Sequence, residues 1–265
     1  MNNSTSNSNT NLSTQLMFYF ITDLLLSPCR LAKHKNYEAV LVIGGSHAYE
    51  SSALIKHNKD GLMKRYGNIY PKIYDLDNLR LAHKNARKDK AFYKEVKMVD
   101  SNEDFYLTQI QEMLINRSYR VSEYEIKTIS DKGKERELMK LPYFPDRIIQ
   151  WAIMLQIESI FDKVFTDCTC ASLPRRGIHR ASHFLSKYME DVPGTEYCLK
   201  LDVRKFYPSI DRKVLKKLLQ RKFKDRDLLD LLFKLIDSVP GEKGVPIGSY
   251  LSQYLANFYL AYFDH

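Results

Sequence analysis

Asp202 is the residue of this sequence whose position best suits metal-ion chemistry. It lies near the end of a run, Tyr197 to Val203, in which apolar residues alternate with Lys200 and Asp202, the period of a half-buried strand. A carboxylate at the rim of a sheet can hold a hard divalent cation, and the cation can bind phosphate. The alternative is an Asp that ends a strand in a solvated turn. Taken alone, this short segment favours that alternative.

Basic residues form a second group of candidates. Lys134 and Arg136 fall at the expected tip of a hairpin, and Arg175 and Arg176 follow a proline. Arg and Lys in a cleft bind phosphate through charge-assisted hydrogen bonds. Between residues 64 and 97 basic residues are interleaved with aromatic ones, a mixture that suits a clamp on a nucleic-acid backbone with stacking on its bases. A solvated basic surface explains the same patterns. The aromatic residues are Tyr66, Tyr70, Tyr74, Phe92 and Tyr93.

Four segments resemble motifs of reverse transcriptases and occur in the order of that family. Leu201 to Asp211 (LDVRKFYPSID) resembles motif A, in which an Asp is followed at the fifth position by an aromatic residue, here Tyr207. Gly244 to Leu260, with GVPIGSYLSQ and LANFYL, is similar to motif B. Two segments upstream resemble motifs of the fingers: Asp146 to Gln150 (DRIIQ) and Ala171 to Ala181 (ASLPRRGIHRA).

The resemblance implies an α+β fold comprising the fingers and part of the palm of a right-hand polymerase. It implies RNA-directed DNA synthesis with Mg²⁺, and template RNA, a DNA primer or cDNA, and dNTPs as partners. In diversity-generating systems a small basic accessory protein is a further partner. The implied site residues are Asp202 (catalytic, and metal-binding with Val203), Tyr207, Lys134, Arg136, Ile247 and Gly248 (nucleotide-binding), and Arg147, Arg175, Arg176, Ser252 and Gln253 (nucleic-acid-binding).

Motif B narrows the subfamily. Group II intron and retron enzymes usually carry Gln-Gly followed by Ser-Pro, whereas this chain has Ile247-Gly248 followed by Ser252-Gln253. That pattern, with the opening Met63 to Gly67, resembles the reverse transcriptases of diversity-generating retroelements, which copy a template RNA with frequent errors at adenines. Two alternatives stay open: a group II-like or phage-defence reverse transcriptase with an unusual motif B, and a non-catalytic nucleic-acid-binding remnant.

One motif of the family does not occur in these 265 residues, namely the Tyr-x-Asp-Asp hairpin that supplies the remaining metal-binding carboxylates. Phosphoryl transfer by two metal ions needs carboxylates from both segments. Asp264 follows motif B on an expected helix and is not accepted as a substitute. We therefore expect residues 1–265 to bind template or nucleotide without catalysis.

Hydrophobic periodicity predicts the elements that position these residues. A capping box at Ser101 to Asp104 is expected to open a helix that ends near Asn116. Asp211 is expected to cap the helix that follows it. The other predictions are a short strand at 39–43, a hairpin of 124–129 and 137–141, a helix from Pro145-Asp146 with Ile149, Ile153, Ile157, Ile160 and Val164 on one stripe, a strand at 197–203, and helices at about 212–221, 227–236 and 250–263.

Composition limits the class of protein. A formal charge of +9 and a pI near 9.2 suit a polyanionic partner. The four cysteines show neither zinc-ligand nor disulfide spacing, which favours free thiols in a reducing cytoplasm. The apolar stretch Leu16 to Leu26 is too short to span a membrane. We expect a disordered start at 1–13 within an extension of 1–62, a basic N-terminal region with the fingers at 63–195, and a partial palm at 196–265.

Overall fold

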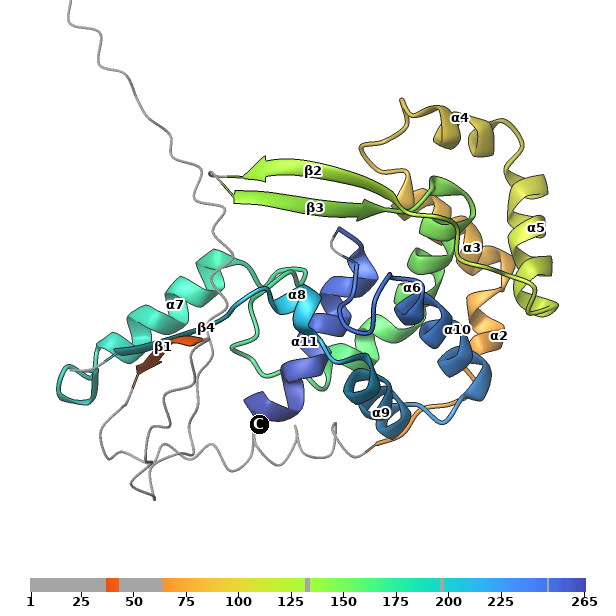
Figure 1. Cartoon of the computed structure of the whole chain (residues 1–265). Coiled ribbons are helices and arrows are strands. Elements are labelled where there is room, and N and C mark those ends of the chain that lie inside the picture. The colour runs from red at the N-terminus through yellow and green to blue at the C-terminus, as the bar shows by residue number, and fades with distance from the viewer. Residues whose placement is uncertain (1–36, 43–63, 132–133, 196–197, 247) are drawn as a thin grey trace, which may run out of the picture.

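The fold is known from a computed structural model that describes residues 37–42, 64–131, 134–195, 198–246 and 248–265. Helices dominate, and the strands form two antiparallel pairs, β1 with β4 and β2 with β3 (Figure 1). This mixture agrees with the expected α+β class. In chain order the elements are β1 (Tyr37–Val42), α2 (Tyr70–Ile73), α3 (Leu76–Ala86), α4 (Lys94–Ser101), α5 (Glu103–Ile115), β2 (Glu125–Asp131), β3 (Lys134–Lys140), the π-helical turn η1 (Tyr143–Arg147), α6 (Ile148–Asp162), α7 (Ile178–Met189), the 3₁₀ turn η2 (Pro193–Thr195), β4 (Cys198–Val203), α8 (Phe206–Ser209), α9 (Arg212–Lys222), α10 (Arg226–Asp237) and α11 (Tyr250–Asp264).

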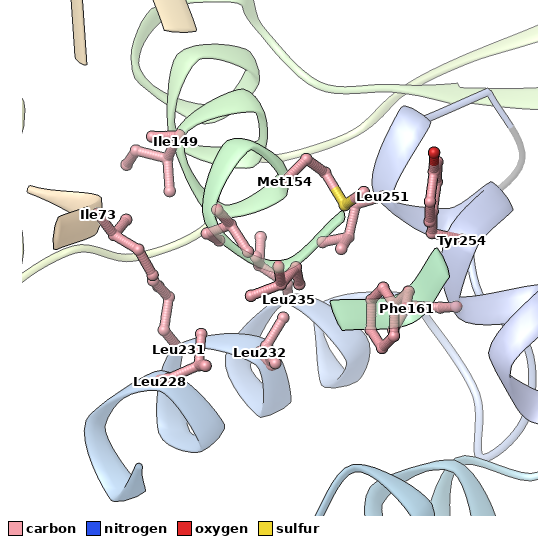
Figure 2. Close-up of a cluster of buried hydrophobic side chains, with 14 of the residues drawn as sticks. Ile73, Ile149, Met154, Phe161, Leu228, Leu231, Leu232, Leu235, Leu251 and Tyr254 are labelled. Carbon is pink, nitrogen blue, oxygen red and sulfur yellow. The ribbon is translucent and has the colours of Figure 1, made fainter. Parts of the chain in front are cut away.

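Helix α6 is the centre of the core. Its predicted isoleucine stripe is buried, which confirms the periodicity argument, and it packs against α3 and α11. Figure 2 shows the leucines of α10 reaching the same cluster, in which Phe161 lies near Tyr254 of α11. Full burial of each such side chain stabilises the fold by about 1.5–3 kcal/mol. The segments that resemble the polymerase motifs therefore pack against one shared hydrophobic core.

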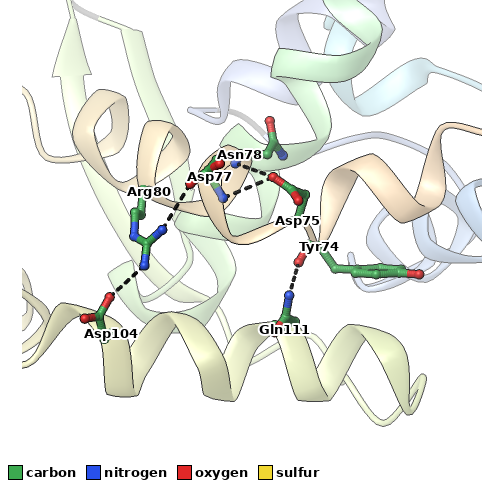
Figure 3. Close-up of polar contacts among 7 residues, drawn as sticks. All are labelled: Tyr74, Asp75, Asp77, Asn78, Arg80, Asp104 and Gln111. Carbon is green, nitrogen blue, oxygen red and sulfur yellow. Dashed lines mark hydrogen bonds and ion pairs between the residues drawn. The ribbon is translucent and has the colours of Figure 1, made fainter.

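Polar contacts fix α3 between α5 and α6. Asp75 caps α3 by accepting hydrogen bonds from the backbone N–H groups of Asp77 and Asn78. Arg80 donates to Asp77 and to Asp104 of α5 at 3.0 Å each, as Figure 3 shows. Buried Asn78 donates to the carbonyl of Ala152 in α6 at 3.1 Å. The N-terminal helices are therefore held to the central helix by hydrogen bonds as well as by apolar packing.

Two local predictions need correction. The capping box is wrong, because Ser101 ends α4, and the N-cap of α5 is Asn102, whose side chain makes no capping bond. The hairpin is longer than expected, since its pairing runs from Glu125↔Lys140 to Asp131↔Lys134. Residues 134–136 were expected in the turn but are part of β3. The hydrogen bonds between the two strands continue through this polar stretch, although the β-propensity of its residues favours a loop. The predicted end of α5 at Asn116 is confirmed.

Strand β4 confirms the strand expected at 197–203, with residue 197 outside the described part. It pairs antiparallel with β1, where a short strand was also expected, and this register sets Glu38 opposite Asp202. The predicted helices appear as α9, α10 and α11. Among the described residues, no helix is both long enough and apolar enough to cross a membrane.

If α6 is the centre of the core, an Ile→Ala substitution should affect the free energy of unfolding differently at a buried and at an exposed position. Ile157 in α6 is fully buried and Ile115 at the end of α5 is 52% exposed. Ile157→Ala should lower the free energy of unfolding by about 2–5 kcal/mol, because it leaves a cavity, whereas Ile115→Ala should change it by about 0.5 kcal/mol or less. Urea denaturation of both variants measures the difference. Equal losses would show that α6 is not the centre of the core.

Candidate functional site

Asp202 lies where the sequence argument expects it, exposed near the end of β4, and Val203 beside it is half-buried. Lys205 then adopts a left-handed conformation with φ 51° and ψ 48°. A non-glycine residue in this region marks a sharp change of direction, and here it leads directly into α8. The strand and the chain reversal expected from the resemblance to motif A are thus present. The Asp202 carboxylate at the end of the strand is accessible to solvent.

The segment after this reversal is hydrogen-bonded to the loop that precedes α11. The N–H of Gly244 donates to the carbonyl of Ile210 at 2.8 Å, and the N–H of Val245 donates to that of Tyr207 at 3.1 Å. Gly244 has φ +90°, and a β-carbon there would lie 3.1 Å from backbone atoms of Pro208. Glycine is needed at this position both for its conformation and for the close approach. The segments resembling motifs A and B therefore meet at backbone distance.

Arg212 holds this junction, and the sequence argument missed it. The residue is only 6% exposed. Nε donates to the carbonyl of Gly244 at 2.8 Å, and Nη2 donates to the carbonyls of Lys243 at 2.9 Å and Pro240 at 3.2 Å. Hydrogen bonds from a charged donor contribute about 1.5–3 kcal/mol each. One buried cation therefore shapes the loop 240–244 and joins it to the start of α9.

The predicted capping role of Asp211 is confirmed. Its carboxylate accepts from the N–H groups of Lys213 at 2.8 Å and Val214 at 3.1 Å. These backbone hydrogen bonds lower the pKa of Asp211. The carboxylate is thereby committed to starting α9, and it is not part of a metal site in this arrangement.

Gly248, just before α11, lies beside the hairpin. Gly248 has φ +109°, and a β-carbon there would lie 3.8 Å from Leu138 of β3. Ser249 caps α11 by accepting from the N–H of Ser252 at 3.0 Å. Ser252 is buried in this cap, while Gln253 is half-buried. Binding of nucleotide by Gly248 and of nucleic acid by Ser252 and Gln253 stays a prediction, and Ile247 lies outside the described residues.

The arginines expected to bind nucleic acid differ in their surroundings. Arg175 is exposed, whereas Arg176 is half-buried and donates to the carbonyl of Thr166 at 3.0 Å. Arg147 is half-buried at the start of α6. Asn257 of α11 donates to the carbonyl of Ala171 at 2.8 Å, which ties the loop 171–176 to the helix of the motif B resemblance. A third motif segment thus joins the first two.

The aromatic residues of the basic region at 64–97 differ in exposure, and binding of nucleic acid by this region stays a prediction. Tyr70 is buried, and its hydroxyl donates to the carbonyl of Leu114 at 2.6 Å. Phe92 and Tyr93 are exposed, with ring centroids 4.5 Å apart. The Tyr93 ring also lies 5.5 Å from Nζ of Lys140 on β3. Lys134 and Arg136 lie on β3 as well.

Asp146 has a structural position that the sequence argument did not foresee. It is fully buried, and Oδ1 accepts from the hydroxyl of Tyr119 at 2.6 Å and from the N–H of Ser122 at 3.1 Å. Burial, with Asp146 as its neighbour, raises the pKa of Tyr119. The carboxylate thereby fixes the chain that enters β2 against the start of α6, so the first motif segment anchors the base of the hairpin.

The described residues contain no group of three or more His, Cys, Asp or Glu side chains placed to hold a metal ion. Magnesium is usually bound by one or two carboxylates together with water and substrate phosphates. An exposed Asp202 at the rim of β4 fits as one ligand of such a site. Cys168 and Cys170 are free thiols, and burial raises the pKa of Cys168 to about 11, which opposes metal binding as thiolate.

Arg212→Gln tests the junction, and Arg226→Gln is its matched control. Each arginine is the first residue of a helix and follows a capping Asp, but Arg226 is exposed. Arg212→Gln should lower the free energy of unfolding by about 2–4 kcal/mol, because carbonyls lose charged donors. Limited trypsin digestion should then cleave faster after Lys243 in this variant alone. Unchanged cleavage would show that the loop does not depend on Arg212.

No protein-family model matches the sequence. Over 221 residues the chain is 24% identical to the group II intron-encoded protein LtrA of Lactococcus lactis subsp. cremoris, with 79% of this chain and 36% of that protein covered. Over 142 residues it is 27% identical to protein YkfC of Escherichia coli K12, with 50% of this chain and 37% of that protein covered. The chain spans little more than a third of the length of these curated relatives. The similarity to both relatives is therefore distant and covers only part of each chain.

Proposed function

We propose that this chain is the fingers and first part of the palm of an RNA-directed DNA polymerase, of the type found in diversity-generating retroelements. Its partners are template RNA, a DNA primer or cDNA, and dNTPs. A small basic accessory protein is a further partner in this proposal. The distant similarity to a group II intron-encoded protein supports the broad class, and the Ile247-Gly248 and Ser252-Gln253 pattern motivates the subfamily.

The convergence of three motif segments carries the proposal. Residues 207–210 bond to the loop 244–245, and Asn257 of α11 bonds to Ala171. These segments are far apart in sequence, and nothing in their local propensities requires them to meet. Enzymes that transfer phosphoryl groups depend mainly on positioning and on charge stabilisation, and both need residues from several segments in one place. The junctions support the proposal, because they bring three segments of the chain into contact.

Within this proposal, Asp202 and Val203 are the residues that hold Mg²⁺, and the bound ion supplies positive charge to phosphate oxygens. Tyr207 is half-buried, with its ring centroid 5.8 Å from that of Phe206. We assign it the position beneath the sugar of the incoming nucleotide. Arg175 is exposed and Arg176 half-buried, and they are assigned to the template backbone, since guanidinium groups bind phosphate in a bidentate manner.

A group II intron-like reverse transcriptase is the second candidate, favoured by the match to LtrA over most of this chain. The residue at position 247 in motif B separates the two candidates. A Gln there would hydrogen-bond the nucleotide or template, whereas the side chain of Ile247 can make only van der Waals contact. Loss of one hydrogen bond changes discrimination by about 0.5–1.5 kcal/mol, a severalfold to tenfold effect on fidelity. A template repeat next to a variable gene in the genome would favour the diversity-generating candidate, and a surrounding group II intron would favour the other.

The proposal predicts salt-dependent binding of RNA by residues 1–265. With a formal charge of +9, the chain should bind a labelled single strand through its phosphates and release counterions. Affinity should fall at least about tenfold between about 50 and about 200 mM salt. Fluorescence anisotropy at both concentrations measures this. Absence of binding at low salt, or affinity that does not change with salt, would contradict the proposal.

A second prediction concerns catalysis by the same 265 residues. Asp202 is the one carboxylate of the expected set that they contain, and two-metal phosphoryl transfer requires more than one. Incubation with a primed RNA template, dNTPs and magnesium should leave the primer at its starting length on a sequencing gel. Template-dependent extension by the purified chain would show that our assignment of the catalytic carboxylates is wrong.

A further inference from the structure

A cationic hollow lies on α9, the helix that follows the segment resembling motif A. It is an open surface depression of about 430 Å³, lined by Arg65, Lys217, Gln220 and Arg221. All four residues are exposed. In Figure 1, α9 lies on the side of the molecule opposite to the β2–β3 hairpin. None of these residues was among the predicted site residues, and none belongs to the junction held by Arg212.

Backbone pairing fixes the position of Arg65 over α9. The N–H of Tyr66 donates to the carbonyl of Lys222 at 2.9 Å, and the N–H of Lys224 donates to the carbonyl of Tyr66 at 2.7 Å. The Asp225 carboxylate accepts from the N–H of Ile69 at 2.7 Å. The segment before α2 is therefore tied to the α9–α10 corner, so the hollow has a defined wall on each side.

Arg65 is partly committed to the end of α9. Its Nη2 donates to the carbonyls of Gln220 at 3.1 Å and Phe223 at 3.3 Å. A guanidinium has five N–H donors in a planar fork. Both bonds come from one nitrogen of that fork, which leaves the others available to an anion in the hollow. The group is thus oriented by the protein before any ligand arrives.

The positive charges of the hollow have no acidic side chain beside them on α9. Lys217 and Arg221 are four residues apart and face the same side of α9, an arrangement that costs a few tenths of a kcal/mol through repulsion. The sequence of α9, RKVLKKLLQRK, contains no acidic residue. Among the described residues, neither Arg65 nor Lys217 nor Arg221 forms an ion pair. The nearby ion pair on α9 belongs to Lys216, which contacts Asp237.

Two simpler explanations account for only part of the cluster. Cations near a helix C-terminus stabilise the helix dipole, which explains Arg65 and Arg221. That effect falls off within the last turn, so it leaves Lys217 unexplained. The lining favours an anion over an apolar ligand, since Arg65, Lys217 and Arg221 are cationic and the hollow is open to solvent. Paired guanidinium groups with a lysine are the donors that phosphate groups prefer.

We propose that this hollow binds the phosphate backbone of RNA outside the reacting site, as a second contact that holds the template on the protein. This inference rests on the proposed function for its choice of RNA over other polyanions. Because the hollow contacts phosphate and no base edge, it binds RNA without sequence preference. A membrane surface with anionic headgroups is the competing partner that the experiment must distinguish.

The experiment compares two double variants of residues 1–265. Lys217→Gln with Arg221→Gln removes two charges from the hollow, while Lys187→Gln with Arg120→Gln removes the same two charge types from exposed positions elsewhere. Binding of a labelled single-stranded RNA is titrated at several salt concentrations. The hollow variant should bind about 5–30-fold more weakly at low salt, and its salt slope should fall by about one to two. The control variant should bind within about twofold of the unmodified chain.

Each outcome separates the inference from the proposed function. Equal losses in both variants, with RNA binding by the unmodified chain, would overturn the hollow as a site and leave the proposed function standing. No RNA binding by the unmodified chain would overturn both. Sedimentation with vesicles of phosphatidylserine and phosphatidylcholine completes the test. Vesicle binding that only the hollow variant loses, with unchanged RNA affinity, would identify a membrane contact and contradict the proposal.

Discussion

The hydrogen bonds from Arg212 to three carbonyls of the loop 240–244 are the constraint on which the candidate site depends. The loop is held by this buried guanidinium together with the backbone hydrogen bond from Gly244 to Ile210. A buried charge is stable only when its donors are satisfied, and here carbonyls of the loop satisfy them. The position of the loop and the burial of the cation are therefore interdependent.

The same constraint reaches the ends of both motif segments. Asp211 caps α9 immediately before Arg212, so the chain that leaves α8 continues into a helix whose first residue is already fixed. On the other side, the loop continues into α11, which packs on α6. Tyr254 of α11 donates to Glu158 of α6 at 3.0 Å. The core helix thus positions the helix that resembles motif B, and the Arg212 junction links that helix to the segment that resembles motif A.

The sequence predicts those features whose cause is local. The isoleucine stripe of α6 and the Asp211 cap depend on residues within one or two turns, and both are confirmed. Arg212 could not be found in this way, because Arg226 occupies the same local position, after a capping Asp at the start of a helix, and is exposed. Only the tertiary position of the loop distinguishes them. Similarly, Tyr70 and Phe92 occur in one basic and aromatic pattern, yet Tyr70 is buried and Phe92 is 68% exposed.

The central claim is that the three joined segments, 171–181, 201–211 and 244–260, present one surface to nucleic acid. The most direct measurement is photocrosslinking of residues 1–265 to a template–primer duplex whose RNA carries 4-thiouridine, with crosslinked peptides identified by mass spectrometry. We predict crosslinks in at least two of the three segments within the same complex. A stable complex whose crosslinks all lie outside these segments would contradict the claim.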